Sequence, residues 1–189
     1  MNTRKKILWI TRTAVLTALL VTLQFATAAL GNQFVTGSIV NLMLIVSLLT
    51  CGPASGLTVA VISPLCASLV GVGPAFPPLI PFIILGNVSF VAAWILAGSL
   101  NKTDENSVRY KIIGVVSAIV SAAVKSLVLY AGIVQFAVPI LLDLNEKQSA
   151  MITLSFSYPQ LITATIGGVI ALAVVPPVRK AIRLRHTPA

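Results

Sequence analysis

The feature that most constrains this chain is the sorting of its basic residues between long apolar runs. All of its 13 Lys and Arg residues except Lys125 and Lys147 gather in three short stretches, one at each end and one near the middle. These are Arg4, Lys5, Lys6 and Arg12; Lys102, Arg109 and Lys111; and Arg179, Lys180, Arg183 and Arg185. Lys and Arg next to membrane spans stay on the cytoplasmic side. The pattern therefore predicts an even number of spans between successive stretches, with both chain ends in the cytoplasm.

Composition agrees with a membrane protein. Hydrophobic residues make up 57% of the chain and charged residues only 9%, whereas a soluble domain carries about 25% charged residues. We expect residues 1–189 to form one transmembrane domain. The net charge of +9 brackets apolar segments instead of forming a patch, so it indicates topology and not nucleic-acid binding. The first apolar run, 13–30, is longer than the core of a cleaved signal peptide, and we interpret it as a retained span.

The apolar runs predict an all-α polytopic membrane protein with six transmembrane helices, because a span needs about 20 apolar residues. The expected helices are Ile7 or Thr13 to Leu30, Thr36–Cys51, Ala54–Val70, Leu79–Leu100, Ile112–Ile133 and Pro159–Val175. The pair Pro176-Pro177 is expected to end the last helix, since proline removes a helical hydrogen bond.

Two of the predicted outer connections are irregular. Residues 71–78 are crowded with Gly and Pro, which excludes a helix there. Residues 134–158 are predicted to be a long outer loop with an interfacial helix near Gln148–Ser157, the alternative being an extra pair of spans. The inner connections are a Gly52-Pro53 turn and a polar loop at 101–109. Irregular loops often serve binding.

Several chemistries lack the residues they need. All four acids are expected in loops, no predicted span contains a carboxylate, and neither cysteine has metal-ligand spacing. These residues are Asp104, Glu105, Asp143, Glu146, Cys51 and Cys66, and the single histidine is His186 in the tail. Ion-coupled carriers usually place ionisable groups within spans. We therefore expect neither an enzyme nor a metal site, and transport must be passive or driven by a partner.

Lys125 is the sharpest candidate for a functional residue. It lies in an apolar run, where charging a side chain at the bilayer centre costs about 2.5–3.5 kcal/mol. Small residues share its helix face at steps of three and four: Gly114, Ser117, Ala118, Ser121 and Ala122. A face of small residues packs against other helices, so Lys125 should point into the bundle. It would suit a carboxylate, a phosphate or a ring carbonyl of a substrate; the alternative is that it snorkels or caps a carbonyl.

Three amides share the expected depth of Lys125, in the outer half of the membrane: Gln24, Asn41 and Asn87. A polar group in lipid needs a hydrogen-bond partner, which neighbouring Ser and Thr could also supply. Together with Lys125 they predict a pocket open to the outside. Its rim or lid is expected to contain Phe76, Tyr130, Phe156, Tyr158 and Gln160, although aromatic residues at this height also anchor membrane helices.

A stripe of small residues runs along the first span at i+4 spacing: Ala14, Ala18, Thr22 and Ala26. Small residues let another helix approach closely. The stripe fits either a partner protein or packing within this chain.

Several segments resemble the substrate-binding S-components of energy-coupling factor (ECF) transporters, the bacterial vitamin importers. They are Arg12–Leu20, with Ala14 and Ala18 as an Ala-x-x-x-Ala pair, and Thr36–Asn41, Pro81–Asn87 and Phe156–Ala164. The resemblance covers nearly the whole chain. It implies a six-helix protein of the bacterial cell membrane that captures a vitamin or related micronutrient from outside with high affinity.

The resemblance also implies the partners. The Ala pair would dock on a transmembrane coupling protein with two cytoplasmic ATPases, so ATP is used by the partners and this chain needs no cofactor. Toppling of the chain in the bilayer would carry the substrate across. Substrate identity does not transfer within the family. The apolar, Pro-rich stretch before Leu79 has no acidic cluster, which argues against a strongly cationic substrate. The alternatives are a self-contained small carrier or facilitator and, less favoured, a membrane enzyme or assembly factor.

Overall fold

The computed structural model describes residues 3–99 and 107–184, which are helical with short connections and contain no strand. The helices are α1 (Thr3–Ala28), α2 (Gln33–Cys51), α3 (Pro53–Leu69), the 3-10 turn η1 (Pro77–Leu79), α4 (Ile80–Ser99), α5 (Val108–Leu129), the π-helix η2 (Tyr130–Leu141), α6 (Glu146–Ser155) and α7 (Tyr158–Leu184). Five helical segments in this part of the chain are long and apolar enough to cross a membrane, and α3 is apolar but shorter. The prediction of an all-α polytopic membrane protein is confirmed.

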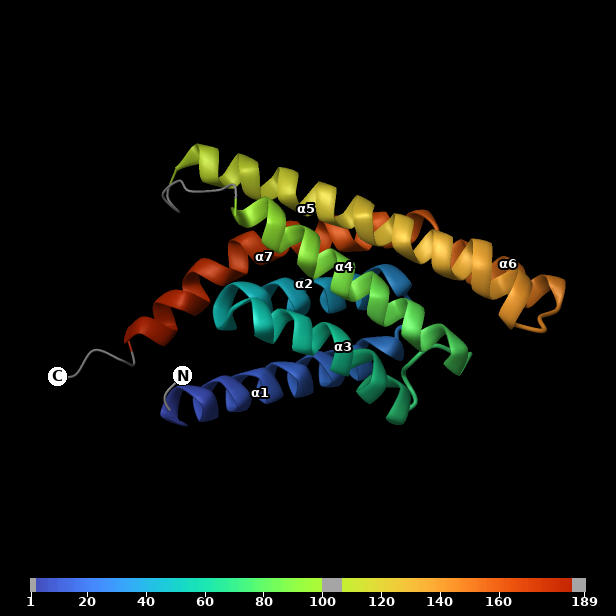
Figure 1. Ribbon diagram of the computed structural model, residues 1–189, viewed down its shortest axis with the longest axis horizontal. Helices are drawn as coiled ribbons and strands as arrows, with labels where there is room; N and C mark the ends of the chain where they lie inside the picture. The colour runs from blue at the N-terminus through green and yellow to red at the C-terminus, as the bar shows by residue number, and fades with distance from the viewer. Residues whose placement is uncertain (1–2, 100–106, 185–189) are drawn as a thin grey trace.

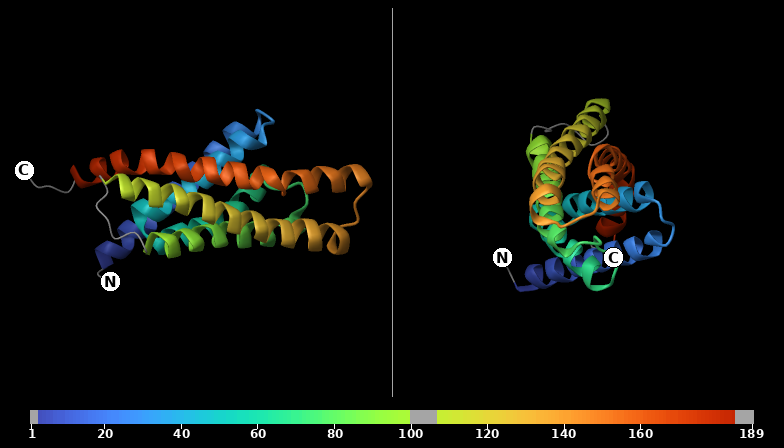
Figure 2. Two further views of the ribbon diagram at one scale, coloured as in Figure 1. Left: turned by 90° about the horizontal axis from the view of Figure 1, so that it is seen from above. Right: turned by 90° about the vertical axis from the view of Figure 1, so that its right-hand side faces the viewer.

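The helices form a bundle in which α2 packs against α1, α3 and α7, while α5 joins α4 to α7. The starts of α1 and α5 and the end of α7 lie at the same end of the bundle, and α6 lies at the other (Figures 1 and 2). The basic residues of the described ranges collect at the first end, as their sorting predicts, apart from Lys125 and Lys147. That this end faces the cytoplasm stays a prediction.

Small residues bring the central helices into close contact. A Cβ atom added to Gly167 of α7 would lie 2.6 Å from the carbonyl oxygen of Ser38 in α2, which is too close. A Cβ on Gly114 of α5 would meet Leu172 of α7 at 2.9 Å. The small-residue face predicted for α5 is buried over its whole length. Backbone-to-backbone approach of this kind is how membrane helices associate without a hydrophobic driving force.

The prediction that the fifth span ends at Ile133 is wrong. The helix continues without a break through η2 to Leu141, and residues 134–141 are not part of a loop. Pro139 lies inside η2, and an i→i+5 bond closes the end of this helix, where Leu142 N–H donates to the carbonyl oxygen of Ala137 at 3.1 Å. Ile133 and Ala137 are fully buried beside Leu79 and Ile152. Tertiary packing of this apolar face outweighs the proline.

The expected helix after this segment exists as α6, which begins two residues before the prediction. Asn145 caps it in a capping box with Gln148, a pattern that satisfies two free N–H groups at a helix start. The polar residues around 143–147 therefore form a turn and a helix start at the end of the bundle opposite the chain termini.

The prediction that Pro176-Pro177 ends the last helix is also wrong, because α7 passes through both prolines to Leu184. A proline inside a helix costs about 3 kcal/mol. The turn beyond the prolines is fastened to α2, since Arg179 Nε and Nη2 donate to the carbonyl oxygen of Leu49 at 3.0 and 2.6 Å. That carbonyl lies near the end of α2, where helical carbonyls lack intrahelical partners. A distant contact, invisible in the local sequence, keeps this helix continuous.

The remaining connections follow the prediction closely. Gly52 joins α2 to α3 at φ 94°, a backbone conformation that favours glycine. The Gly- and Pro-rich stretch 70–76 is irregular, and Pro77 and Pro78 open the single 3-10 turn η1. The predicted loop at 101–109 falls mainly outside the described residues, as do Lys102, Asp104, Glu105, Arg185 and His186; Ser107 caps the start of α5.

Candidate substrate-binding site

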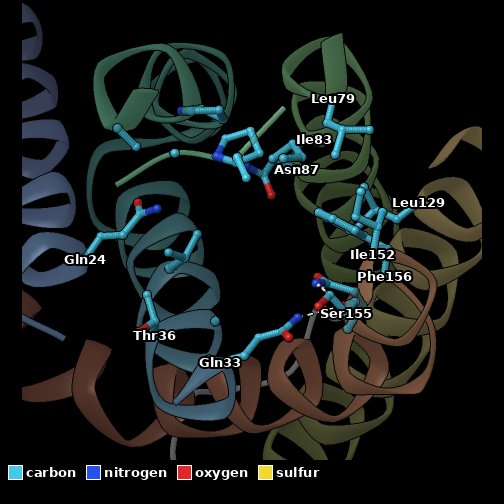
Figure 3. A pocket seen from close by; sticks show the side chains of 18 of the residues that line it. Gln24, Gln33, Thr36, Leu79, Ile83, Asn87, Leu129, Ile152, Ser155 and Phe156 are labelled. Atoms are coloured by element: carbon cyan, nitrogen blue, oxygen red, sulfur yellow. Dashed lines mark hydrogen bonds between the residues drawn. The ribbon is translucent and has the colours of Figure 1, made fainter. Parts of the chain in front are cut away.

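A cavity of about 620 Å³ opens between the helix ends that lie away from the chain termini. Its wall takes residues from α1 to α7 and from the irregular stretch before η1. Gln24, Gln33 and Thr36 lie on one side, and Leu79, Ile83, Leu129 and Ile152 lie on the other (Figure 3). The cavity is therefore amphipathic, and its size is typical of a site for a small organic molecule.

Lys125 lies in the wall of this cavity and is only 3% exposed. Its Nζ donates hydrogen bonds to Asn41 Oδ1 at 2.6 Å and to Asn87 Oδ1 at 2.7 Å. The ring of the buried Phe90 lies with its centroid 5.5 Å from the same nitrogen, within range of a cation–π contact. The prediction that Lys125 points into the bundle is confirmed, and three of the predicted site residues form one hydrogen-bonded cluster.

Local packing fixes the cluster. Asn41 Nδ2 donates to the carbonyl oxygen of Gly37, one turn earlier in α2, at 2.8 Å. This bond orients the amide so that its oxygen faces Lys125. Gly167 of α7 presses against the backbone of α2 at Asn41, so the position of Asn41 depends on this close contact between the two helices. Buried polar networks of this kind are rigid when every member is satisfied.

The structure brings most of the predicted site residues to this cavity. Gln24, Asn41, Phe76, Asn87, Lys125 and Gln160 line it, and so does Phe156. Gln24 Nε2 donates to the carbonyl oxygen of Val72 at 3.4 Å, and Gln160 Nε2 donates to that of Ser155 at 3.1 Å.

Tyr130 and Tyr158 lie elsewhere. They are 41% and 57% exposed and do not belong to the cavity wall. The rim position expected for these two residues is not where the structure places them. Tyr130 begins η2, and its hydroxyl accepts a hydrogen bond from Gln135 Nε2 at 2.9 Å.

Several lining residues were not singled out from the sequence. Gln33 was read as part of a loop, but it begins α2, and its Nε2 donates to the carbonyl oxygen of Ser155 at 2.6 Å across the cavity mouth (Figure 3). The signal for this helix start was Asn32, whose side chain accepts from Phe34 N–H and Val35 N–H. Gln148 and Met151 line the cavity because α6 folds back over it, which the predicted loop did not reveal.

Ser63 adds an unused polar group to the wall. It lines the cavity and is 2% exposed, and its hydroxyl has no hydrogen-bond partner among the described residues. An unpaired buried hydroxyl is costly. A ligand oxygen is one group that could satisfy it.

A second hollow, of about 550 Å³, runs along α1 and α3. Ala14 and Ala18 line it, together with residues such as Trp9, Ile62 and Cys66. Both alanines are exposed, whereas Thr13 and Thr17 beside them are buried. The small-residue stripe of α1 thus forms part of an open groove.

In residues 3–99 and 107–184, no three His, Cys, Asp or Glu side chains gather closely enough to hold a metal ion. Both cysteines are free thiols.

A fold of this kind, with a buried polar cluster in a cavity, defines a membrane protein that binds a small solute. Comparison with protein families gives the class a name: residues 9–179 match the family described as ECF transporter, substrate-specific component. The match covers most of the chain, which therefore belongs to this family of transporter subunits. Comparison with curated proteins and with solved structures finds no significant match.

Proposed function

We propose that this chain captures a vitamin or related micronutrient from outside the cell in the cavity around Lys125. The observation that carries the proposal is the buried amine of Lys125, held by Asn41 and Asn87 in the wall of a cavity of about 620 Å³. Ionisable residues within membrane spans tend to be functional, because they are expensive to bury. The cavity opens away from the end that carries the basic clusters, and the positive-inside rule supports a mouth on the outside.

Delivery to the cytoplasm requires partners in this proposal. The groove along Ala14 and Ala18 is the docking face for a transmembrane coupling protein, and two cytoplasmic ATPases supply the energy. Small side chains there allow a partner helix to approach closely. The complex works in the bacterial cell membrane, and the chain itself holds no cofactor.

The site is tested by replacing Lys125 in the purified chain. The ligand is first identified by mass spectrometry of a heat extract and then used for titration. Lys125→Ala should weaken its binding by about 30-fold or more, since truncating one partner of a buried charged contact is costly. Lys147→Ala, an exposed lysine outside the cavity, is the matched control and should bind normally. Unchanged affinity of Lys125→Ala, with the fold retained, would return Lys125 to a structural role.

The transport role is tested in proteoliposomes. Uptake of the extracted compound should need the coupling protein, both ATPases and ATP, whereas the chain alone should bind without net transport. Uptake by the chain alone would instead identify a self-contained carrier and contradict the proposal.

A further inference from the structure

The charge balance of the cavity restricts the substrate more narrowly than its size does. Among residues 3–99 and 107–184, Lys125 is the one charged residue that lines the cavity, and no Asp or Glu lines it. The acids that the structure describes are Asp143, just before α6, and Glu146, its first residue; both are exposed and lie outside the wall. A buried charge is costly unless it is paired. Nothing in the cavity wall supplies the opposite charge.

The Lys125 amine contacts neutral groups that an ammonium can bond. Two amide oxygens accept from it at 2.6 and 2.7 Å, and the face of Phe90 attracts a cation. These three partners carry no negative charge. An ammonium has three N–H donors, of which two are used by Asn41 and Asn87. The third is left for a ligand, because Lys125 borders the cavity.

We infer that the substrate is a monoanion whose carboxylate pairs with Lys125 while an apolar body rests on the opposite wall. This inference rests on the proposed function and specifies its substrate class. One ammonium balances one negative charge, and the wall contains no arginine or second lysine for the extra charge of a phosphate. The unpaired hydroxyl of Ser63 is a further donor on the same cavity wall. A cationic substrate would meet an uncompensated like charge.

The apolar side of the cavity fits this orientation. Leu79, Ile83, Leu129 and Ile152 form one surface, and the amides of Gln24 and Gln33 lie across from it (Figure 3). Apolar contact supplies area-dependent binding energy, whereas the amides can bond to polar groups on the body of the substrate. The anionic group then has a single charged partner, and the discrimination between acid and neutral analogues should depend on Lys125.

The test compares acids with neutral twins that lack only the charge: pantothenate with pantothenol, biotin with biotinamide, and lipoate with lipoamide, with thiamine as a cation. Binding of each probe to the purified full chain is measured by calorimetry. The tightest binder should be an acid, and its neutral twin should bind about 30-fold or more weakly. In Lys125→Met this ratio should fall to about one, because no charge remains to discriminate. Lys147→Met is the control, and it should keep the wild-type ratio.

Each outcome of this test either supports or overturns the inference that the substrate is a monoanion. A neutral twin that binds about as well as its acid, preferred binding of thiamine, or an unchanged ratio in Lys125→Met would overturn the inference and leave the proposed function standing. The wild-type ratio needs no variant, so misfolding of Lys125→Met would not prevent the decision. If no probe binds, the compound recovered by heat extraction replaces the panel, and a neutral or cationic compound overturns the inference. If neither a probe nor an extracted compound binds, the proposed function fails and the inference with it.

Discussion

The two hollows of this molecule are close in size and opposite in chemistry. The cavity around Lys125 measures about 620 Å³ and the groove along α1 and α3 about 550 Å³. In the cavity, Lys125 and Ser63 keep hydrogen-bonding capacity that the protein does not use. In the groove, two threonine hydroxyls donate to backbone carbonyl oxygens: Thr17 to that of Thr13 at 2.9 Å, and Thr58 to that of Ala54 at 2.8 Å.

The cavity and the groove differ in whether their polar atoms already have hydrogen-bond partners within the protein. Thr13 shows it as well, since its hydroxyl donates to Ser55 Oγ at 2.9 Å. A groove lined by alanines and by apolar side chains such as Trp9 and Ile62 offers shape with few directional bonds, which suits a helix from another membrane protein. A cavity with free donors suits a polar ligand. Hollows of similar volume therefore fit different partners, and variants in one should leave the function of the other intact.

The double variant Ala14→Leu, Ala18→Leu is expected to separate docking on the groove from ligand binding in the cavity most strongly. Overpacking costs about 1–3 kcal/mol per site, so the two together should weaken docking about 100-fold. Uptake by proteoliposomes containing the full transporter should fall accordingly, while calorimetric ligand binding by the isolated chain stays unchanged.

Ala173→Leu provides the matched control for that variant. Ala173 is exposed on α7 and lines neither hollow, so the same enlargement there should leave uptake normal. Normal uptake by the double variant would rule out the groove as the docking face.

A smaller effect, confined to the cavity, is expected from Gly167→Ala. Its new Cβ would lie 2.6 Å from Ser38 O and 2.8 Å from Asn41 Cβ, so α2 must move and carry Asn41 with it. We expect a loss of about 1–3 kcal/mol of stability and ligand binding weakened about tenfold. Thermal unfolding and titration measure the two effects.

Gly98→Ala is the control for this substitution. A Cβ on Gly98 of α4 meets nothing within 4 Å, and alanine there should be neutral or stabilising by up to about 1 kcal/mol. Equal behaviour of the two variants would mean that the α2–α7 contact does not position Asn41.

Much of the fold was predictable because few backbone structures can cross a membrane. Apolar length and the basic clusters were enough for six helices and for the placement of both termini at one end. The two wrongly predicted helix ends, at Ile133 and at Pro176-Pro177, have a common cause. In each case a contact distant in sequence, the packing of Ile133 and Ala137 or the bond from Arg179 to Leu49, stabilises a helix that local rules would end.

The sequence predicted those residues of the candidate site that lie at one depth in the membrane. Lys125, Asn41 and Asn87 are polar residues at one level of neighbouring spans, and they are in direct contact. Gln33 and Gln148 could not be found this way, because their place depends on α6 folding back over the cavity. Tyr130, expected at the rim, does not line the cavity, and the helix that was expected to end at Ile133 continues past it into η2.

The smallest effect is expected at the cavity mouth, where Gln33 joins α2 to the end of α6. Its Nε2 donates to the carbonyl oxygen of Ser155 at 2.6 Å, and Gln160 Nε2 donates to the same oxygen at 3.1 Å. Loss of one neutral hydrogen bond costs about 0.5–1.5 kcal/mol, and Gln160 still holds the acceptor. Gln33→Ala should therefore speed ligand dissociation only about 2- to 10-fold, measured by stopped-flow or filter binding, with association nearly unchanged.

Gln135→Ala is the control, because it removes a comparable hydrogen bond of a side-chain amide, to Tyr130 at 2.9 Å, outside both hollows. If both variants release the ligand at the same rate, the Gln33–Ser155 contact does not help to close the cavity. The polar contacts that distinguish the cavity from the groove are then those of the cluster around Lys125.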